Sequence, residues 1–188
     1  MKRLKVKKKI VGIDYSLNCP AVCILDHKGF LSSKFYYITT KKKYEGNITN
    51  NIKGFLMKPW EDPIERFKLL SDFVLENLPN NSIIFIEGYS FGSKGRAIFQ
   101  IAENGGILKY RLTGQEYHII PPANVKKFAT GKGNANKEKM YHQLIQDQGV
   151  DLKKMADQQT LDSPVSDIID SYYIAKCGYE SIKSSKTS

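Results

Sequence analysis

The chain has 188 residues, of which 41% are hydrophobic and 26% charged, a composition that is typical of one folded domain and excludes an intrinsically disordered chain. Lysine and arginine together number 29 against 19 aspartates and glutamates, so the formal net charge is +10. This excess favours a polyanionic partner such as nucleic acid, although a lysine-rich surface can also serve solubility alone.

The sequence predicts no membrane segment. No stretch approaches the roughly 20 consecutive apolar residues that a membrane helix needs. The apolar run at 10–13 ends at Asp14 and is too short for the core of a secretory signal. We therefore expect a cytoplasmic protein, in a bacterium or in a phage-infected host cell, with no membrane partner.

The first third of the chain predicts short strands. Residues 10–15, 21–25 and 30–39 are apolar and rich in β-branched or aromatic side chains, and turn-forming residues separate them. Residues 41–63 are polar and punctuated by Lys, Asn and Gly, which predicts a long loop or an insertion.

Helices and strands alternate in the remainder. Residues 63–78 place apolar side chains three and four positions apart, as in a helix with one buried face. The Ile-Ile-Phe-Ile run within 82–87 is typical of a central strand that is covered on both faces. A helix, a strand and two further helices are expected at 96–112, 117–120, 136–148 and 165–179.

These elements predict a single α/β domain over residues 10–180. A basic tail at 1–9 precedes the domain, and a tail rich in Lys and Ser at 181–188 follows it. The last helix is expected to start at Ser163-Pro164, because serine caps helices and proline suits the first helical position.

Four acidic residues stand at the ends of predicted elements. Asp14 and Glu87 each end an apolar strand, where an unpaired buried charge would be costly. Asp167 and Asp170 are three residues apart and therefore share one face of the last helix. Taken singly, each acid could form a structural ion pair or favour the positive end of a helix. Taken together, the acids would repel one another strongly unless cations neutralised them.

The chemistry that suits such a group is binding of hard divalent cations. Carboxylate oxygens select Mg²⁺, for which Mn²⁺ can substitute. Two such ions can activate a water molecule and stabilise the leaving oxygen of a phosphodiester. We therefore expect a basic protein with this site to cut nucleic acid.

Five stretches of sequence resemble the motifs of a known family, in the same order. These are residues 10–16 (IVGIDYS), 83–91 (IIFIEGYSF), 121–126 (PPANVK), 130–137 (TGKGNANK) and 167–175 (DIIDSYYIA). The family is that of the RuvC-like Holliday junction resolvases, the crossover junction endodeoxyribonucleases. Bacterial members have Pro-Gly where Tyr15-Ser16 stand here, so we expect a divergent, bacteriophage-type branch.

The resemblance implies both a fold and an activity. It implies an α/β, RNase H-like fold with a central mixed five-stranded sheet flanked by helices. It implies a homodimer that nicks four-way DNA junctions, and possibly other branched DNA, with two Mg²⁺ ions in each active site. The residues implied as catalytic and metal-binding are Asp14, Glu87, Asp167 and Asp170.

Two segments are candidates for contact with DNA. Lys132 and Lys137 lie in or next to a glycine-rich loop and could reach phosphates, although a simply solvated loop is the alternative. The loop after Glu87 interleaves aromatic and basic side chains, which suits stacking on unpaired bases at a branch point. The alternative is that its rings fill the core. The residues concerned are Tyr89, Phe91, Lys94 and Arg96.

The helix at 96–112 is the candidate dimer interface. It carries an apolar stripe at three- and four-residue spacing, and Gly105-Gly106 would allow a second helix to approach closely. The alternative is that the stripe packs on the sheet of its own chain. The members of the stripe are Ile98, Ile101, Gly105, Leu108 and Leu112.

Other functions remain open on sequence alone. The opening Gly-Ile-Asp also begins actin-like ATPases of the sugar-kinase type, although 188 residues offer only one of the two domains that clamp ATP. A catalytically inactive DNA-binding module of the same fold is a second alternative. A nuclease that acts on RNA or RNA–DNA hybrids is a third, because fold alone does not set the substrate.

Overall fold

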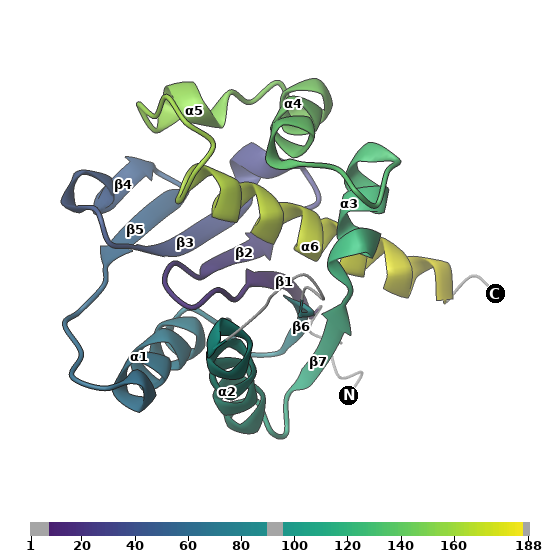
Figure 1. Ribbon diagram of the computed structural model, residues 1–188. Coiled ribbons are helices and arrows are strands. Elements are labelled where there is room, and N and C mark those ends of the chain that lie inside the picture. Colours follow the sequence, from purple (N-terminus) through teal and green to yellow (C-terminus); the bar gives the residue numbers. More distant parts are fainter. Residues whose placement is uncertain (1–7, 90–95, 186–188) are drawn as a thin grey trace, which may run out of the picture.

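A seven-stranded mixed sheet forms the centre of the protein (Figure 1). The computed structural model describes residues 8–89 and 96–185. The strands lie in the order β4-β5-β3-β2-β1-β6-β7. Their bounds are Lys9–Asp14 (β1), Ala21–Leu25 (β2), Lys34–Thr39 (β3), Gly46–Thr49 (β4), Ile52–Leu56 (β5), Ser82–Glu87 (β6) and Glu116–Ile120 (β7).

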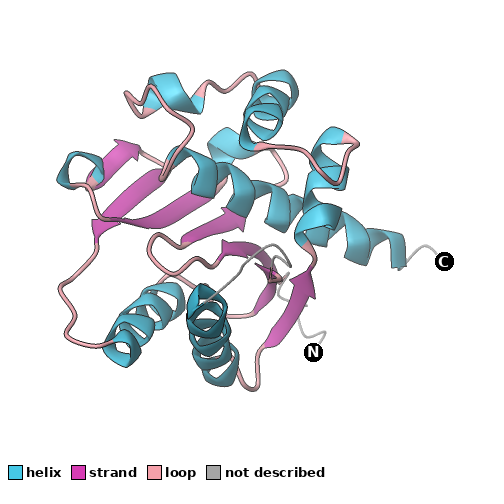
Figure 2. Ribbon diagram, in the orientation of Figure 1, coloured by secondary structure: helices cyan, strands magenta, loops and turns pink. Residues whose placement is uncertain are grey.

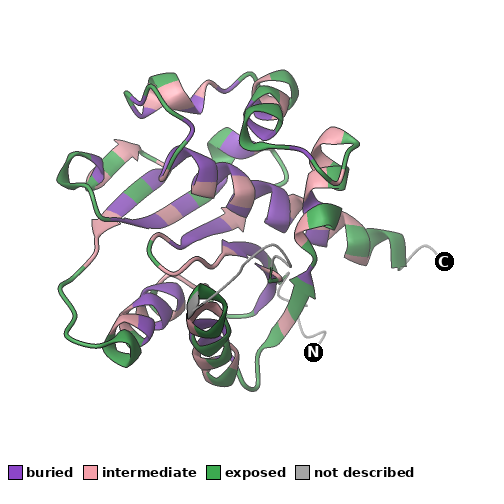
Figure 3. Cartoon of the chain, viewed as in Figure 1, coloured by how far each residue is buried: buried purple, intermediate pink, exposed green. Residues whose placement is uncertain are grey.

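Helices cover both faces of the sheet (Figure 2). Helices α1 and α2 pack against one face, and α6 crosses the other with α3, α4 and α5 around it. Burial is concentrated in the central strands and in α6 (Figure 3). The bounds are Pro63–Glu76 (α1), Arg96–Arg111 (α2), Pro122–Thr130 (α3), Lys137–Gln148 (α4), Leu152–Met155 (α5) and Val165–Ser185 (α6), with short 3-10 helices at Phe30–Ser32 and Lys42–Tyr44.

The prediction of a mixed α/β sheet flanked by helices is confirmed, but the prediction of five strands is wrong. The two additional strands, β4 and β5, come from the segment at 41–63 that was predicted as a loop. Strand β5 pairs in parallel with β3, and Ile52 is almost completely buried. Gly54 lets the Tyr37 ring and the Tyr44 backbone approach where a side chain would stand. This edge therefore depends on contacts between segments and not on a local apolar pattern.

Some of the observed helix boundaries differ from the predicted ones. Helix α1 starts as predicted at Pro63, where the Asp62 side chain accepts hydrogen bonds from two backbone N–H groups, and it ends at Glu76. Helix α6 starts at Val165, one residue after Pro164, so the predicted cap is displaced. It continues to Ser185, so residues 181–185 are helical although a loose tail was expected there. No helix in the two described ranges is long and apolar enough to cross a membrane.

Glycine 12 sets the position of α6 on the sheet. A Cβ atom at Gly12 would lie 2.3 Å from the carbonyl oxygen of Ser171 and 2.4 Å from the backbone nitrogen of Ala175. The backbone of α6 therefore rests directly on β1, an approach that only glycine permits. A second close approach occurs at Gly178, where a Cβ would overlap the Phe85 ring of β6. Together these contacts direct the start of α6 towards the carboxyl ends of β1 and β6.

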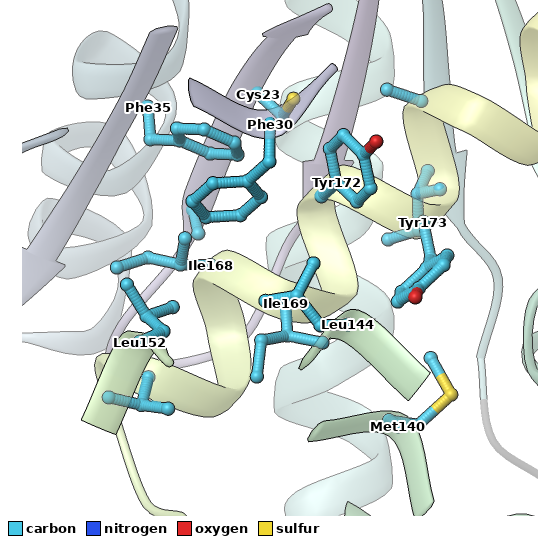
Figure 4. Packing of buried hydrophobic residues seen from close by; sticks show 14 of the residues in the cluster. Cys23, Phe30, Phe35, Met140, Leu144, Leu152, Ile168, Ile169, Tyr172 and Tyr173 are labelled. Atoms are coloured by element: carbon cyan, nitrogen blue, oxygen red, sulfur yellow. The ribbon is translucent and has the colours of Figure 1, made fainter. Parts of the chain in front are cut away.

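The first turns of α6 are held by a buried cluster on this face of the sheet (Figure 4). The Phe30 ring stacks on Phe35 with centroids 4.4 Å apart and meets the edge of Tyr172 at 5.3 Å. Ile168 points towards these rings, whereas Ile169 points towards α4 (Figure 4). The apolar neighbours of Asp167 and Asp170 are thus buried on two sides, which fixes where the two acids project.

Candidate active site

Side-chain alternation places Asp14 and Glu87 on the same face of the sheet. On β1, Ile10 belongs to the cluster beneath α6 and Ile13 to the cluster beneath α1 and α2. Asp14 is therefore directed towards α6, because successive strand residues point to opposite faces. On β6 the same alternation directs Phe85 and Glu87 towards α6. The strands are parallel neighbours, so both acids end their strands at one edge of the sheet.

Helix α6 brings the other two predicted acids to this edge. Asp167 and Asp170 are partly exposed, whereas Ile168 and Ile169 between them are buried. Asp14 and Glu87 follow the paired residues Ile13 and Ile86 on neighbouring strands, and repulsion from Glu87, Asp167 and Asp170 acts on the carboxyl of Asp14. The structure therefore brings together four acids that are up to 156 positions apart in the chain, from Asp14 to Asp170.

The four carboxylates carry more negative charge than their buried surroundings favour. Burial raises the pKa of Asp14 well above its usual value, and repulsion from the other three carboxylates raises it further. Burial, with repulsion from Glu87 and Asp167, raises the pKa of Asp170 to about 7. The pKa values of Glu87 and Asp167 are also raised, chiefly by burial. Such upward shifts indicate a site that favours added positive charge.

Two lysines supply part of that charge. Nζ of Lys137 donates to Oγ of Ser166 at 3.3 Å, and this hydroxyl donates to Oδ1 of Asp167 at 3.0 Å. Lys137 thereby stands beside the acids, at the start of α4, and it opposes the rise in the pKa of Asp14. Lys126 in α3 likewise acts on the carboxyl of Glu87.

Lys126 is not among the predicted contacts, although it lies in one of the family-like motifs. Its position follows from the pairing of β6 with β7, in which Glu87 is opposite Ile120. Helix α3 begins two residues after Ile120, so its first turns necessarily lie beside Glu87. A prediction that strand 117–120 pairs with strand 82–87 would have placed Lys126 near Glu87.

The acids fit a divalent cation in their chemistry. Oδ2 of Asp167 is buried and has no hydrogen-bond partner among the described residues. An unpartnered buried carboxylate oxygen beside three further carboxylates matches the all-oxygen ligand set of Mg²⁺ or Mn²⁺. In residues 8–89 and 96–185, however, no three such side chains are close enough to hold one ion in this conformation. Binding an ion would therefore draw the carboxylates closer together.

The predicted DNA contacts are only partly described. Lys132 is exposed on the turn after α3. Tyr89 lies against α2: its hydroxyl accepts a hydrogen bond from Nζ of Lys109 at 3.0 Å, and a side chain at Gly105 would overlap its ring. Three predicted contacts cannot be placed, because Phe91, Lys94 and the side chain of Arg96 lie outside the described residues.

The predicted dimer stripe on α2 faces inward for much of its length. Leu108 and Leu112 are buried against the sheet of the same chain, and Gly105 is covered by Tyr89. These residues are therefore not available to a partner, and the stripe as predicted is wrong at these positions. The exposed side of α2 carries two aromatic residues instead, Phe99 (69% exposed) and Tyr110 (81% exposed).

Solved structures of Holliday junction resolvases are similar to this chain. Thermus thermophilus RuvC in complex with a Holliday junction substrate is 17% identical, with a TM-score of 0.63 over 95% of this chain and 97% of that one. A Thermus thermophilus RuvC structure is 16% identical, with a TM-score of 0.57 over 92% and 96%. The yeast mitochondrial Holliday junction resolvase is 16% identical, with a TM-score of 0.55 over 90% and 77%.

Sequence comparison adds nothing to this structural similarity, since no protein-family model and no curated protein sequence matches the chain. The low identities are in keeping with a divergent chain. The agreement extends over nearly the whole length of this chain and is not confined to the central strands. On this evidence the chain has the RNase H-like fold of the RuvC-type resolvases.

Proposed function

We propose that this chain is a metal-dependent endodeoxyribonuclease that nicks four-way DNA junctions and other branched DNA in the cytoplasm. The observation that carries the proposal is the meeting of Asp14, Glu87, Asp167 and Asp170 at one edge of the sheet. The net charge of +10 supports a polyanionic substrate, and the resolvase fold supports a branched one.

The four acids are the proposed ligands of two Mg²⁺ ions, for which Mn²⁺ substitutes. Such a pair of ions, when bound, activates a water molecule and stabilises the leaving oxygen of the phosphodiester. The protein contributes a closely packed frame, since the backbone of α6 rests on β1 at Gly12, where no side chain separates them. Burial, with added repulsion from the neighbouring carboxylates, raises the pKa values of Asp14 and Asp170, which supports a site that favours a bound cation.

Lysines on the same side of the sheet are the proposed phosphate ligands. Lys126 and Lys137 stand next to the carboxylates, where a scissile phosphate would add negative charge. Lys137 also holds Ser166, and through it one oxygen of Asp167, which couples phosphate contact to the orientation of an acid. Lys132, exposed on the neighbouring turn, is the proposed contact with the DNA backbone further out. Tyr89, Phe91, Lys94 and Arg96 remain proposed contacts at the branch point.

A homodimer is proposed on the exposed side of α2. Paired nicking of a four-way junction requires two active sites, and exposed aromatic residues are typical of protein interfaces. Gly106 between Phe99 and Tyr110 leaves open space for a second helix. Replacing Phe99 and Tyr110 by serine should convert a dimer into monomers in sedimentation; a wild-type chain that sediments as a monomer at micromolar concentration would exclude this interface.

A single gel assay tests the activity. The protein in Mg²⁺ is given a four-way junction, a three-way fork, linear duplex and an RNA–DNA hybrid, and we expect nicking of the branched DNA. The variants Asp14→Asn, Glu87→Gln, Asp167→Asn and Asp170→Asn should bind the junction but lose nicking. Asp157→Asn is the matched control, because Asp157 is exposed and its φ of 47° suits asparagine.

Each outcome of this assay discriminates between functions. Junction binding without nicking by the wild-type chain would indicate an inactive DNA-binding module. Preferential cutting of the hybrid would indicate a ribonuclease. A normal nicking rate in one of the four acid variants would remove that residue from the site.

A further inference from the structure

The segment that adds β4 and β5 to the sheet carries a basic surface. Residues 41–58 contain five lysines and one glutamate. Lys42 forms an ion pair with this glutamate, Glu45. Three other lysines of the segment are exposed and have no carboxylate partner within the described part of the chain. They are Lys41, Lys43 and Lys58, and we call them the edge lysines.

The edge lysines lie at the same edge of the sheet as the four acids. Strand β2 is antiparallel to both β1 and β3, so β3 runs parallel to β1, and β5 is parallel to β3. Through β2, Tyr37 of β3 is level with Asp14 of β1, and β3 continues two residues further. Lys41 follows the end of β3, and Lys58 follows the end of β5. Figure 1 shows β5 ending on the side of the molecule where α6 begins.

The backbone that carries the edge lysines is anchored to the sheet. Tyr44, which ends the turn after β3, is buried, and its carbonyl oxygen accepts a hydrogen bond from the hydroxyl of Tyr37 at 2.7 Å. The backbone N–H of Met57 donates to the carbonyl oxygen of Thr39 at 2.8 Å, which joins the ends of β5 and β3. Groups that are already ordered bind a partner at a smaller entropic cost. The edge lysines therefore suit a partner whose charges are also regularly spaced.

The strand order sets the distance between the edge lysines and the acids. Strand β3 is the second neighbour of β1, and β5 is the third. Because adjacent strands are about 4.8 Å apart, the edge lysines extend about 10 to 14 Å from Asp14 across the sheet. On the other side of the acids, Lys126 acts on the carboxyl of Glu87. The acids thus lie between two groups of lysines.

The partner that fits this arrangement is the backbone of duplex DNA. Each strand of a duplex carries a phosphate about every 3.4 Å along the axis, so 10 to 14 Å corresponds to about three to four base pairs. A lysine ammonium group contacts phosphate as a point charge and does not itself specify a base. A row of such groups that leads away from a proposed phosphodiester-cutting site continues the line of phosphates that this site would hold.

We propose that the edge lysines bind the phosphate backbone of one duplex arm of the junction, about three to four base pairs from the phosphate that is cut. This inference rests on the proposed function and deepens it, because it assigns the holding of an arm to the segment that adds β4 and β5. Lys126 and Lys137 hold the phosphate at the cut, and the edge lysines hold phosphates further along the arm.

The first test compares two variants that lose the same charge from opposite edges of the sheet. One variant replaces the three edge lysines by alanine. The affinity for a four-way junction is measured in EDTA between about 50 and 200 mM salt. Loss of three phosphate contacts should reduce the slope of log affinity against log salt by about 2.7, so the affinity of this variant should fall about 40-fold less than that of wild type over this range.

The matched control replaces three exposed lysines at the other edge by alanine. Two of them stand at the starts of β1 and β3, and the third follows the end of the antiparallel strand β2. This control should keep the wild-type slope. Because all six lysines are exposed, both variants should also keep the wild-type melting temperature. The three control residues are Lys9, Lys28 and Lys34.

The second test locates the contact on the DNA. A neutral methylphosphonate replaces one phosphate at a time along an arm, again in EDTA. Wild-type affinity should fall at one or more positions about three to four base pairs along the arm from the phosphate that is cut. The variant without edge lysines should show no loss at these positions, because the contact already lacks its protein partner. The control variant should show the same losses as wild type.

The outcomes separate this surface from the proposed activity. Position-specific losses in a wild-type protein that nicks no junction would support the surface and overturn the nuclease. Normal nicking with equal salt slopes in the two variants would overturn the surface and leave the nuclease intact. If the variant without edge lysines melted early, the wild-type scan would still decide, since the absence of any loss along the arm beyond the cut phosphate would overturn the inference.

Discussion

The two faces of the sheet use the ends of β1 and β6 in opposite ways. On the α6 face, four carboxylates are held close together by a helix whose backbone touches the strand at Gly12. On the α2 face, the same strand ends line a mainly apolar cavity. Asp14 and Tyr15 are consecutive residues, yet they serve different faces.

This difference shows how one strand can contribute both to the hydrophobic core and to the candidate active site. In the middle of β1, Val11 and Ile13 are completely buried and stabilise the fold. At its end, Asp14 is crowded by like charges, which opposes folding in the absence of a cation. The α6 face thus combines tight backbone packing with unfavourable charge, whereas the α2 face is an apolar cluster with a cavity at the ends of β1 and β6.

The largest effect is expected from Gly12→Ala. The new Cβ would meet backbone atoms of Ser171 and Ala175, which cannot rotate away, so α6 must shift. We expect the free energy of unfolding to fall by about 3 kcal/mol or more in urea denaturation. Ile64→Ala in α1 is the control, because Ile64 is 59% exposed; here the free energy of unfolding should change by about 0.5 kcal/mol or less. Equal stability of the two variants would show that α6 does not rest on β1.

Cation binding should stabilise the protein through the α6 face. With Mg²⁺ at about 100 times its dissociation constant, the folded state gains about 2.7 kcal/mol, which is measured as a rise in the melting temperature. Asp14→Asn and Asp167→Asn should reduce or remove this rise, because each deletes a charged ligand. Asp157→Asn should retain it in full. An equal rise in all four proteins would mean that Mg²⁺ binds elsewhere.

Removing one of the crowded charges should stabilise the cation-free protein. The pKa of Asp170, about 7 in the folded state, lies above the ordinary value of 3.8, so between these values the folded state binds more protons than the unfolded chain. Wild-type stability in EDTA should therefore fall as the pH rises from about 4 to about 7. At pH 8, Asp170→Asn should be more stable than wild type by on the order of 1 kcal/mol, since one pKa unit corresponds to about 1.4 kcal/mol.

Asp72 provides a control, because its pKa is shifted in the opposite direction from that of Asp170. Burial acts to raise the pKa of Asp72. Hydrogen bonds from Lys68 and Arg111 outweigh this effect, so the pKa is lowered overall. Its contribution to stability is therefore present above the ordinary pKa of 3.8 and is lost as the pH falls through the lower folded-state value. Asp72→Asn should destabilise the protein at pH 8 by about 1 kcal/mol or less, as expected for a partly exposed pair. If Asp170→Asn also destabilised at pH 8, the carboxylates would not be crowded.

The smallest effect concerns the salt dependence of junction binding. Each phosphate contact contributes about 0.9 to the slope of log affinity against log salt concentration, so Lys126→Ala and Lys137→Ala should each reduce the slope by about this amount. Lys34→Ala is the control, because Lys34 is exposed at the start of β3, at the opposite edge of the sheet from Asp14. A comparable reduction from Lys34→Ala would indicate diffuse attraction without a defined phosphate site.

Much of the candidate site could be predicted from local sequence. Asp14 and Glu87 interrupt apolar runs, and Asp167 and Asp170 share a helix face, so their unusual positions are visible without any knowledge of tertiary contacts. The order along the chain of α1, α2, α4 and α6 and of the five predicted strands, β1, β2, β3, β6 and β7, follows equally from apolar periodicity, since burial of one face imposes a repeat on the sequence.

Other features were decided only by tertiary contacts. Strands β4 and β5 have little periodicity and exist because they pair with β3. Lys126 joins the site because β7 pairs with β6, and the α2 stripe proved to be covered by its own sheet. The cavity on the α2 face arises where two strands and a helix leave space between them. Strand pairing and burial depend on residues far apart in the chain, whereas apolar periodicity reflects only the environment of each segment. The sequence alone therefore determined which residues carry the chemistry. The tertiary structure decided which of these residues meet.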